Sequence, residues 1–79
     1  MTSFMFEIYY KAPVSSEREE AIASALKPFG GRLDCHEYSG GSDGPVILTY
    51  EFGSLEQANA GAEVVRALGE HVEGPGPYG

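Results

Sequence analysis

The sequence of 79 residues predicts a single α+β domain spanning 1–79, and three observations support this. Residues 3–11 and 46–52 alternate in polarity and are rich in aromatic and β-branched side chains, as in strands. Residues 17–27 and 55–68 place apolar side chains at helical spacing. Turn residues, mostly Gly and Pro, separate these segments. Because strands and helices follow one another without a long linker, we expect one sheet covered by helices.

The first strand and helix are bounded by local signals. Residues 3–11 place Phe4, Phe6, Ile8 and Tyr10 on one face and Met5, Glu7, Tyr9 and Lys11 on the other. Pro13 ends this strand. Ser16 and Glu19 have the spacing of a capping box, which predicts a helix over 17–27 that ends before Gly30 and Gly31.

The next segments predict a hairpin and a second helix. Residues 32–39 alternate more weakly, with Leu33, Cys35 and Glu37 expected to face the helices and Asp34, His36 and Tyr38 the other side. The glycine-rich loop 40–45 leads into the strand 46–52. Ser54 and Gln57 form a second capping box, and the helix that follows ends at Gly69.

Residues 71–79 give the weakest indication of secondary structure. A fourth strand at 71–73 rests on Val72 alone, and turn residues dominate 74–79, which we expect to be a flexible tail. The order strand, helix, strand, strand, helix predicts the split βαβ arrangement called ferredoxin-like. In it, strands 3–11 and 46–52 are central in an antiparallel sheet, with both helices on one face.

Acidic residues are concentrated in the second half of the chain. The whole sequence has 12 Asp and Glu against 5 Lys and Arg, a net charge of −7. Residues 1–32 carry four of each sign, whereas residues 33–79 carry eight carboxylates against Arg66. A concentrated negative field favours a protein partner with a basic surface and disfavours nucleic acid and anionic membranes.

Two surfaces are expected to carry these acids. The sheet face without helices combines carboxylates with Tyr and Met, a composition typical of binding surfaces. Glu56 and Glu63 lie opposite the apolar stripe of the second helix, two turns apart. The candidate partner-binding residues are therefore Glu7, Tyr9, Asp34, Tyr38, Glu51, Glu56 and Glu63.

No catalytic residue, cofactor or metal site is predicted. Cys35 is the only cysteine, so no disulfide framework exists, and we expect it to fill the core. Cys35 and His36 are neighbours on a strand and point to opposite faces, so they do not form a thiolate and base pair. Asp34 and His36 would need Glu51 or Glu7 to bind a metal, which is an unspecific signal. His36 is the one candidate for an enzymatic role.

Two plainer explanations of the acidity remain open at this stage. Acidic residues on a small protein often serve solubility alone. The open sheet face is also a candidate for homodimerisation through Met5, Tyr9 and Ile47, as in small regulatory or ligand-binding domains of this topology. Without an apolar stretch of about 20 residues or a signal-peptide pattern, we expect a cytoplasmic protein that does not enter membranes.

In size, acidity and compact α+β build, the chain resembles small phage-type anti-CRISPR proteins, some of which mimic DNA. The resemblance implies an inhibitor that occludes the basic surface of a partner such as a CRISPR effector subunit. Because it rests on no sequence motif, it transfers no functional residue. Either a monomer or a homodimer fits this expectation.

Overall fold

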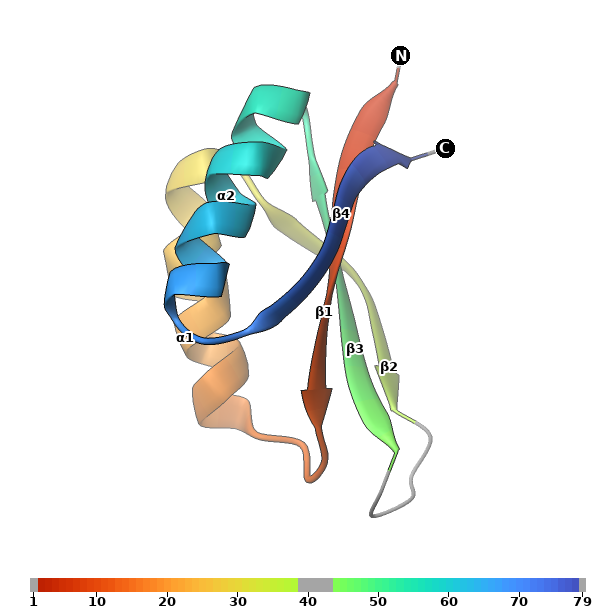
Figure 1. The fold of residues 1–79 in the computed structure, drawn as a ribbon, viewed down its shortest axis with the longest axis vertical. Helices are drawn as coiled ribbons and strands as arrows, with labels where there is room; N and C mark the ends of the chain where they lie inside the picture. The colour runs from red at the N-terminus through yellow and green to blue at the C-terminus, as the bar shows by residue number, and fades with distance from the viewer. Residues whose placement is uncertain (1, 39–43, 79) are drawn as a thin grey trace.

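The structure is a computed structural model that describes residues 2–38 and 44–78. It has two layers, a twisted sheet and a pair of helices on one side of it (Figure 1). In chain order the elements are β1 (Ser3–Lys11), α1 (Ser16–Leu26), the 3₁₀ turn η1 (Lys27–Phe29), β2 (Arg32–Tyr38), β3 (Pro45–Phe52), α2 (Leu55–Ala67) and β4 (His71–Tyr78).

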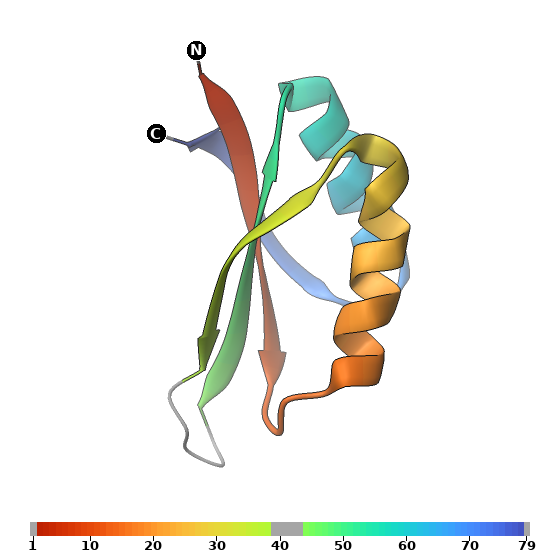
Figure 2. The same cartoon turned by 180° about the vertical axis from the view of Figure 1, so that it is seen from behind.

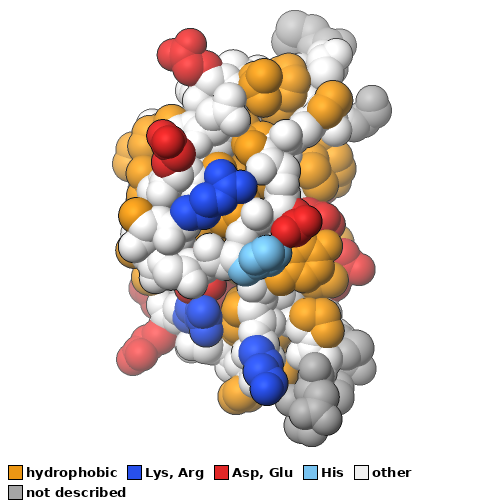
Figure 3. All heavy atoms as spheres, viewed as in Figure 1, with side chains coloured by type: hydrophobic (Ala, Val, Ile, Leu, Met, Phe, Trp, Pro, Cys, Tyr) orange, Lys and Arg blue, Asp and Glu red, His pale blue; other side chains and the backbone are white. Residues whose placement is uncertain are grey.

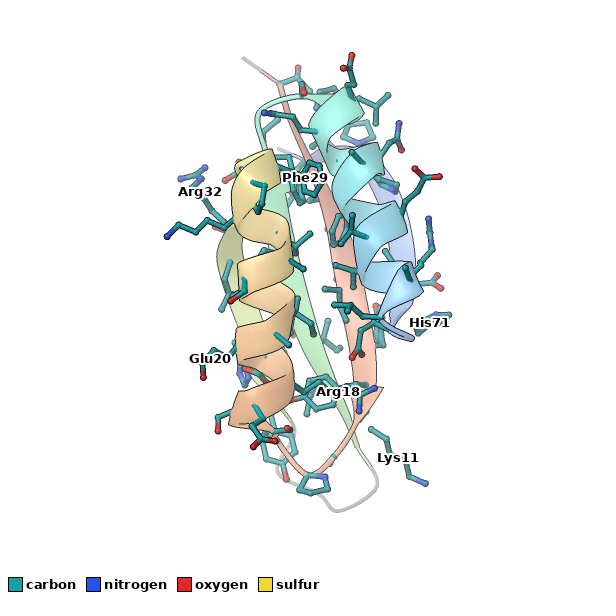
Figure 4. The ribbon with its side chains drawn as sticks, turned by 90° about the vertical axis from the view of Figure 1, so that its left-hand side faces the viewer. Lys11, Arg18, Glu20, Phe29, Arg32 and His71 are labelled. Atoms are coloured by element: carbon teal, nitrogen blue, oxygen red, sulfur yellow. The ribbon has the colours of Figure 1, made fainter. Side chains whose placement is uncertain are left out.

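The sheet has the order β2-β3-β1-β4, and all its neighbouring strands are antiparallel. This arrangement confirms the predicted α+β class and is compatible with a ferredoxin-like fold, with β1 and β3 in the centre. Both helices cover the same face, and they lie side by side in front of the strands in Figure 4. The opposite face carries no helix (Figure 2).

The core lies between the helices and the sheet. Phe6 and Phe52 form its aromatic centre, with ring centroids 5.0 Å apart. Small residues on α2 let the helix approach the sheet closely, because Ala58, Gly61 and Ala62 are all buried. The buried side chains form one cluster: Phe6, Ile8, Tyr10, Ile22, Leu26, Val46, Leu48, Tyr50, Phe52, Ala58, Ala62, Val65 and Val72.

Both helices begin at a serine cap, although one cap differs from the prediction. The Ser54 hydroxyl accepts the Gln57 amide N–H at 3.1 Å, as the predicted capping box requires. In α1 the cap is Ser15, which accepts the Arg18 N–H at 3.2 Å. The prediction of Ser16 is therefore wrong by one residue: Ser15 caps the helix through its own hydroxyl, although the residue three positions after it is Arg18 and not an acid.

The C-terminal segment is longer and more ordered than the sequence indicated. β4 runs from His71 to Tyr78 and pairs with β1 from Tyr9 back to Ser3. Residues 74–78 are thus a strand and not a tail. The register shifts between Met5 and Glu7, where β4 carries an extra residue. This bulge accommodates the Gly and Pro residues that made the sequence look like a turn.

A second bulge, in β2, reverses the predicted facing of several side chains. Leu33 pairs with Tyr50 and Cys35 with Thr49, so Asp34 is the extra residue. Beyond it, His36 pairs with Leu48 and Tyr38 with Val46, on the helix side. The predictions that His36 and Tyr38 lie on the open face and that Cys35 faces the core are therefore wrong. One inserted residue shifts the alternation of the strand.

Gly31 is required by close packing, and this gives a stability prediction. A Cβ at Gly31 would lie 2.8 Å from the Phe52 ring and 3.1 Å from the Leu26 side chain. We expect Gly31→Ala to lower the free energy of unfolding by about 1–3 kcal/mol, the usual cost of overpacking a core. Gly76→Ala is the matched control, since a Cβ there meets nothing within 4 Å. Urea denaturation of the two variants checks this, and equal stability would contradict it.

Candidate functional site

The open face of the sheet gathers carboxylates from β1, β2 and β4, in addition to Glu51 on β3, which pairs with Arg32. Antiparallel partners share a face, so the register identifies its members. Glu7 on β1 lies opposite Glu73 on β4, and Glu37 on β2 lies opposite Ile47 on β3. Asp34 lies on the same side, because its carboxylate accepts a hydrogen bond from Tyr78. We call the following residues the acidic sheet face: Glu7, Tyr9, Asp34, Glu37, Glu73 and Tyr78.

Two tyrosines are fixed within this field of negative charge. The Tyr9 hydroxyl donates to Glu7 Oε1 at 3.0 Å. This hydrogen bond, partial burial and the charges of Glu7, Glu73 and Glu37 raise the pKa of Tyr9. The hydrogen bond to Asp34, partial burial and nearby carboxylates likewise raise the pKa of Tyr78 to about 12. Both phenols stay neutral at physiological pH and present fixed rings for contact.

The open face keeps a net negative charge although two cations lie on it, Lys11 at the end of β1, two residues after Tyr9, and Arg32 on β2. Arg18 is bound to Glu70 at 2.7 Å on the helix side. Arg66 donates to the carbonyl groups of Val72 and Gly74. Arg32 pairs with Glu51 at 2.5 Å, at one end of the sheet. In Figure 3, acidic and hydrophobic side chains gather along the right-hand margin, where the open face begins.

The structure brings together only some of the predicted site residues. Glu7, Tyr9, Asp34 and Glu51 share the open face, although Glu51 is already paired with Arg32. Tyr38 lies on the helix side of β2. Glu56 and Glu63 are exposed on α2, in the other layer of the molecule. The seven residues therefore lie in three separate places, of which the open face holds the largest set.

Sequence reasoning missed Glu37, Glu73 and Tyr78 as members of this face. The alternation of β2 predicts Glu37 on the helix side. A bulge changes its face, and no residue type in 32–38 indicates this bulge. Glu73 and Tyr78 depend on β4, which the sequence did not extend past residue 73. For Glu73, the alternation of polar and apolar side chains at residues 71–73 was the one sequence pattern that indicated a strand.

The helix side of the sheet holds a separate polar network. Glu19 on α1 accepts a hydrogen bond from the Tyr10 hydroxyl and lies 3.0 Å from His36 Nε2. His36 and Asp34 are therefore on opposite faces, so they do not act together on a metal. Among residues 2–38 and 44–78, no group of three or more His, Cys, Asp or Glu side chains is arranged to hold a metal ion.

An open hollow on the acidic sheet face is lined by Tyr9, His71 and Glu73. The His71 ring meets the Tyr9 ring edge-on at 6.2 Å between centroids, and His71 Nε2 lies 2.5 Å from Glu73 Oε2. Its aromatic ring and carboxylate suit the hollow to contact a cationic side chain.

The comparisons with known proteins add no assignment. No protein-family model matches the chain, and no curated protein matches its sequence. In the part of the chain that the structure describes, neither helix has the length and apolar character needed to cross a bilayer.

The Tyr78–Asp34 hydrogen bond gives a pH prediction. Because folding raises the pKa of Tyr78 from 10.0 to about 12, the native state keeps a proton that the unfolded chain loses. This contribution to stability is complete below pH 10 and is lost as the pH rises towards 12. We expect Asp34→Asn to lower the Tyr78 pKa towards 10.0. An ultraviolet titration against a Tyr78→Phe reference checks this, and an unchanged pKa would contradict it.

Proposed function

We propose that the protein is a binding module that uses its acidic sheet face to cover a basic, nucleic-acid-binding surface of a partner protein. The observation that supports this most is the face itself, where β1, β2 and β4 present carboxylates around fixed tyrosines and no helix covers them. A surface of this composition complements Lys and Arg side chains that otherwise hold phosphates. The activity is inhibition by occlusion and requires no catalysis.

The spacing of the carboxylates supports the sheet face over α2 as the contact surface. Cross-strand partners such as Glu7 and Glu73 have Cβ atoms about 5 Å apart. Glu56 and Glu63 are seven residues apart on α2, or about 10 Å along the helix. Duplex DNA carries about one charge per 1.7 Å of its axis. The sheet face therefore approaches the charge density of DNA more closely than the helix does.

The tyrosines add contact area to the charge. Tyr9 and Tyr78 are both held by hydrogen bonds to carboxylates, so little side-chain entropy is lost on binding. Aromatic rings that are rigid before association are frequent centres of binding energy. Together with the carboxylates they favour a defined protein contact over charge that serves solubility alone.

This proposal matches the resemblance to anti-CRISPR inhibitors in mechanism, with a nucleic-acid-binding effector in the cytoplasm as the kind of target. Homodimerisation by stacking two open faces is less consistent with the charges. It would bring one acidic sheet face against another, and like charges at an interface are unfavourable.

Affinity capture followed by competition tests the proposal. The tagged protein is incubated with nuclease-treated extract of its host, and each captured protein is purified and assayed for binding to labelled duplex DNA by fluorescence anisotropy. We expect a partner that binds DNA, and whose DNA is displaced by this protein in a salt-sensitive way. Captured partners that keep their DNA when saturated with the protein would overturn the proposal.

A further inference from the structure

We infer that β2 is a self-complementary sheet edge on which a second copy of this chain pairs antiparallel, with Arg32 of each copy opposite Glu37 of the other. Two four-stranded sheets then join into one continuous sheet. The inference concerns the edge of the sheet and stands independently of the partner proposed for its open face.

The two edges of the sheet differ in their capacity to pair. The β4 edge contains Pro75 and Pro77, which lack the N–H groups that another strand needs. Arg66 also occupies the carbonyl groups of Val72 and Gly74, at 3.3 and 3.1 Å. These features close the β4 edge to a further strand.

The β2 edge carries none of these protections. It contains no proline, and within the described part of the chain no side chain or loop is hydrogen-bonded to its backbone. Figure 2 shows β2 at the margin of the sheet, with its outer side uncovered by either helix. Leu33 and Tyr38 are 50% and 42% exposed there. An uncovered edge with exposed apolar side chains is a template for another strand.

The bulge at Asp34 makes β2 match itself. Arg32 and Glu37 are five residues apart and would face opposite sides in a regular strand, but here both lie on the open face, opposite Glu51 and Ile47. Leu33 and His36 both lie on the helix side. In the antiparallel register with residue 32 opposite residue 37, every pair therefore joins side chains of the same face, as a sheet requires.

Charge complementarity selects a second copy as the occupant. The two-fold arrangement produces the Arg32–Glu37 pair twice, and Figure 4 places Arg32 at the outer, β2 side of the molecule. In this register each Asp34 lies opposite Cys35 of the other copy, and its carboxylate already accepts a hydrogen bond from Tyr78 of its own chain. The contact is small, so we expect a weak dimer that forms at high protein concentration.

Charge-swap variants test this pairing. Sedimentation velocity of the wild-type protein up to about 1 mM is compared with Arg32→Glu, Glu37→Arg and an equimolar mixture of the two. In either variant alone, both symmetric pairs become like-charged, and we expect dimerisation to weaken by about thirtyfold. In the mixture, the opposite charges face each other again at both contacts, so a heterodimer should form.

Two controls separate the edge from other effects. Glu63→Arg makes the same charge change as Glu37→Arg on α2, away from β2, and should leave dimerisation unchanged. Glu51→Gln removes the partner of Arg32 within the chain and tests whether that pair alone explains the Arg32→Glu result. Circular dichroism confirms that each variant is folded. A monomer at every concentration, or a dimer that ignores the charge swap, would overturn the inference.

Discussion

Phe52→Ala is expected to remove about 3–5 kcal/mol from the free energy of unfolding, the usual loss for a buried Phe. The side chain is 1% exposed and packs on Phe6. Gly31 and Gly61 both lie against its ring, since a Cβ at either position would approach it within 3.2 Å. These two neighbours are backbone atoms, which cannot move far into the space left by the ring. The cavity should therefore stay open and add to the loss of stability.

The loss is large compared with the stability of the domain. At about 0.05–0.15 kcal/mol per residue, a chain of this length has roughly 4–12 kcal/mol of stability in total. Guanidinium denaturation measures the change, with Leu55→Ala as a control because Leu55 is 44% exposed. If the Ala variant does not fold, Phe52→Leu gives a smaller measurable loss. A loss below about 1 kcal/mol for Phe52→Ala would show that the core is not centred on this ring.

The second large effect concerns the acidic sheet face. We expect Glu7→Lys combined with Glu37→Lys to weaken binding to the captured partner by at least about a hundredfold. Each substitution removes a carboxylate that contacts a cation and adds a repulsive charge in its place, and close interfacial charge pairs contribute about 1.5 kcal/mol or more each. Isothermal titration calorimetry measures the change in affinity.

Glu56→Lys combined with Glu63→Lys is the matched control. Both double variants change the net charge from −7 to −3, since each replaces two acids by two bases. Long-range attraction therefore falls by a similar amount in both, and this acts mainly on the association rate. The dissociation rate should rise only in the Glu7 and Glu37 variant. Equal dissociation rates in the two variants would count against the sheet face as the contact surface.

Local sequence patterns predicted the fold because they carry most of the packing information. The alternation in β1 and β3 and the apolar stripe of α2 fixed which faces are buried, and the core contains the residues expected on those faces. The Ser54 cap was predictable for a similar reason, since the capping hydrogen bond joins residues three apart in the chain.

The edge strands were predicted less well because their structure depends on tertiary pairing. β2 is mostly exposed, so burial does not enforce its alternation, and a bulge at Asp34 shifts its register. β4 contains Gly74, Pro75, Gly76 and Pro77, which disfavour a strand locally, yet pairing with β1 holds this segment extended. These two strands contribute Glu37, Glu73 and Tyr78, so the errors in the fold became omissions at the site.

Only some of the acids that are in excess in residues 33–79 form an acidic surface in the structure. Arg18 and Glu70 neutralise each other on the helix side, and Arg32 pairs with Glu51 at the sheet margin. Which acids remain unpaired depends on these contacts, and a count along the chain does not reveal them. The acidic sheet face is what remains after this pairing, with Lys11 as a cation at its end.

The most direct test of this account is to map a cationic probe on the folded protein. An octa-arginine peptide is titrated into the ¹⁵N-labelled protein at about 0.15 M ionic strength, where weak surface charges are screened beyond about 8 Å. The account predicts amide shift changes concentrated at Glu7, Tyr9, Glu37 and Glu73, and their loss in the Glu7 and Glu37 variant. Shift changes centred on Glu56 and Glu63 of α2, or spread evenly over the molecule, would contradict it.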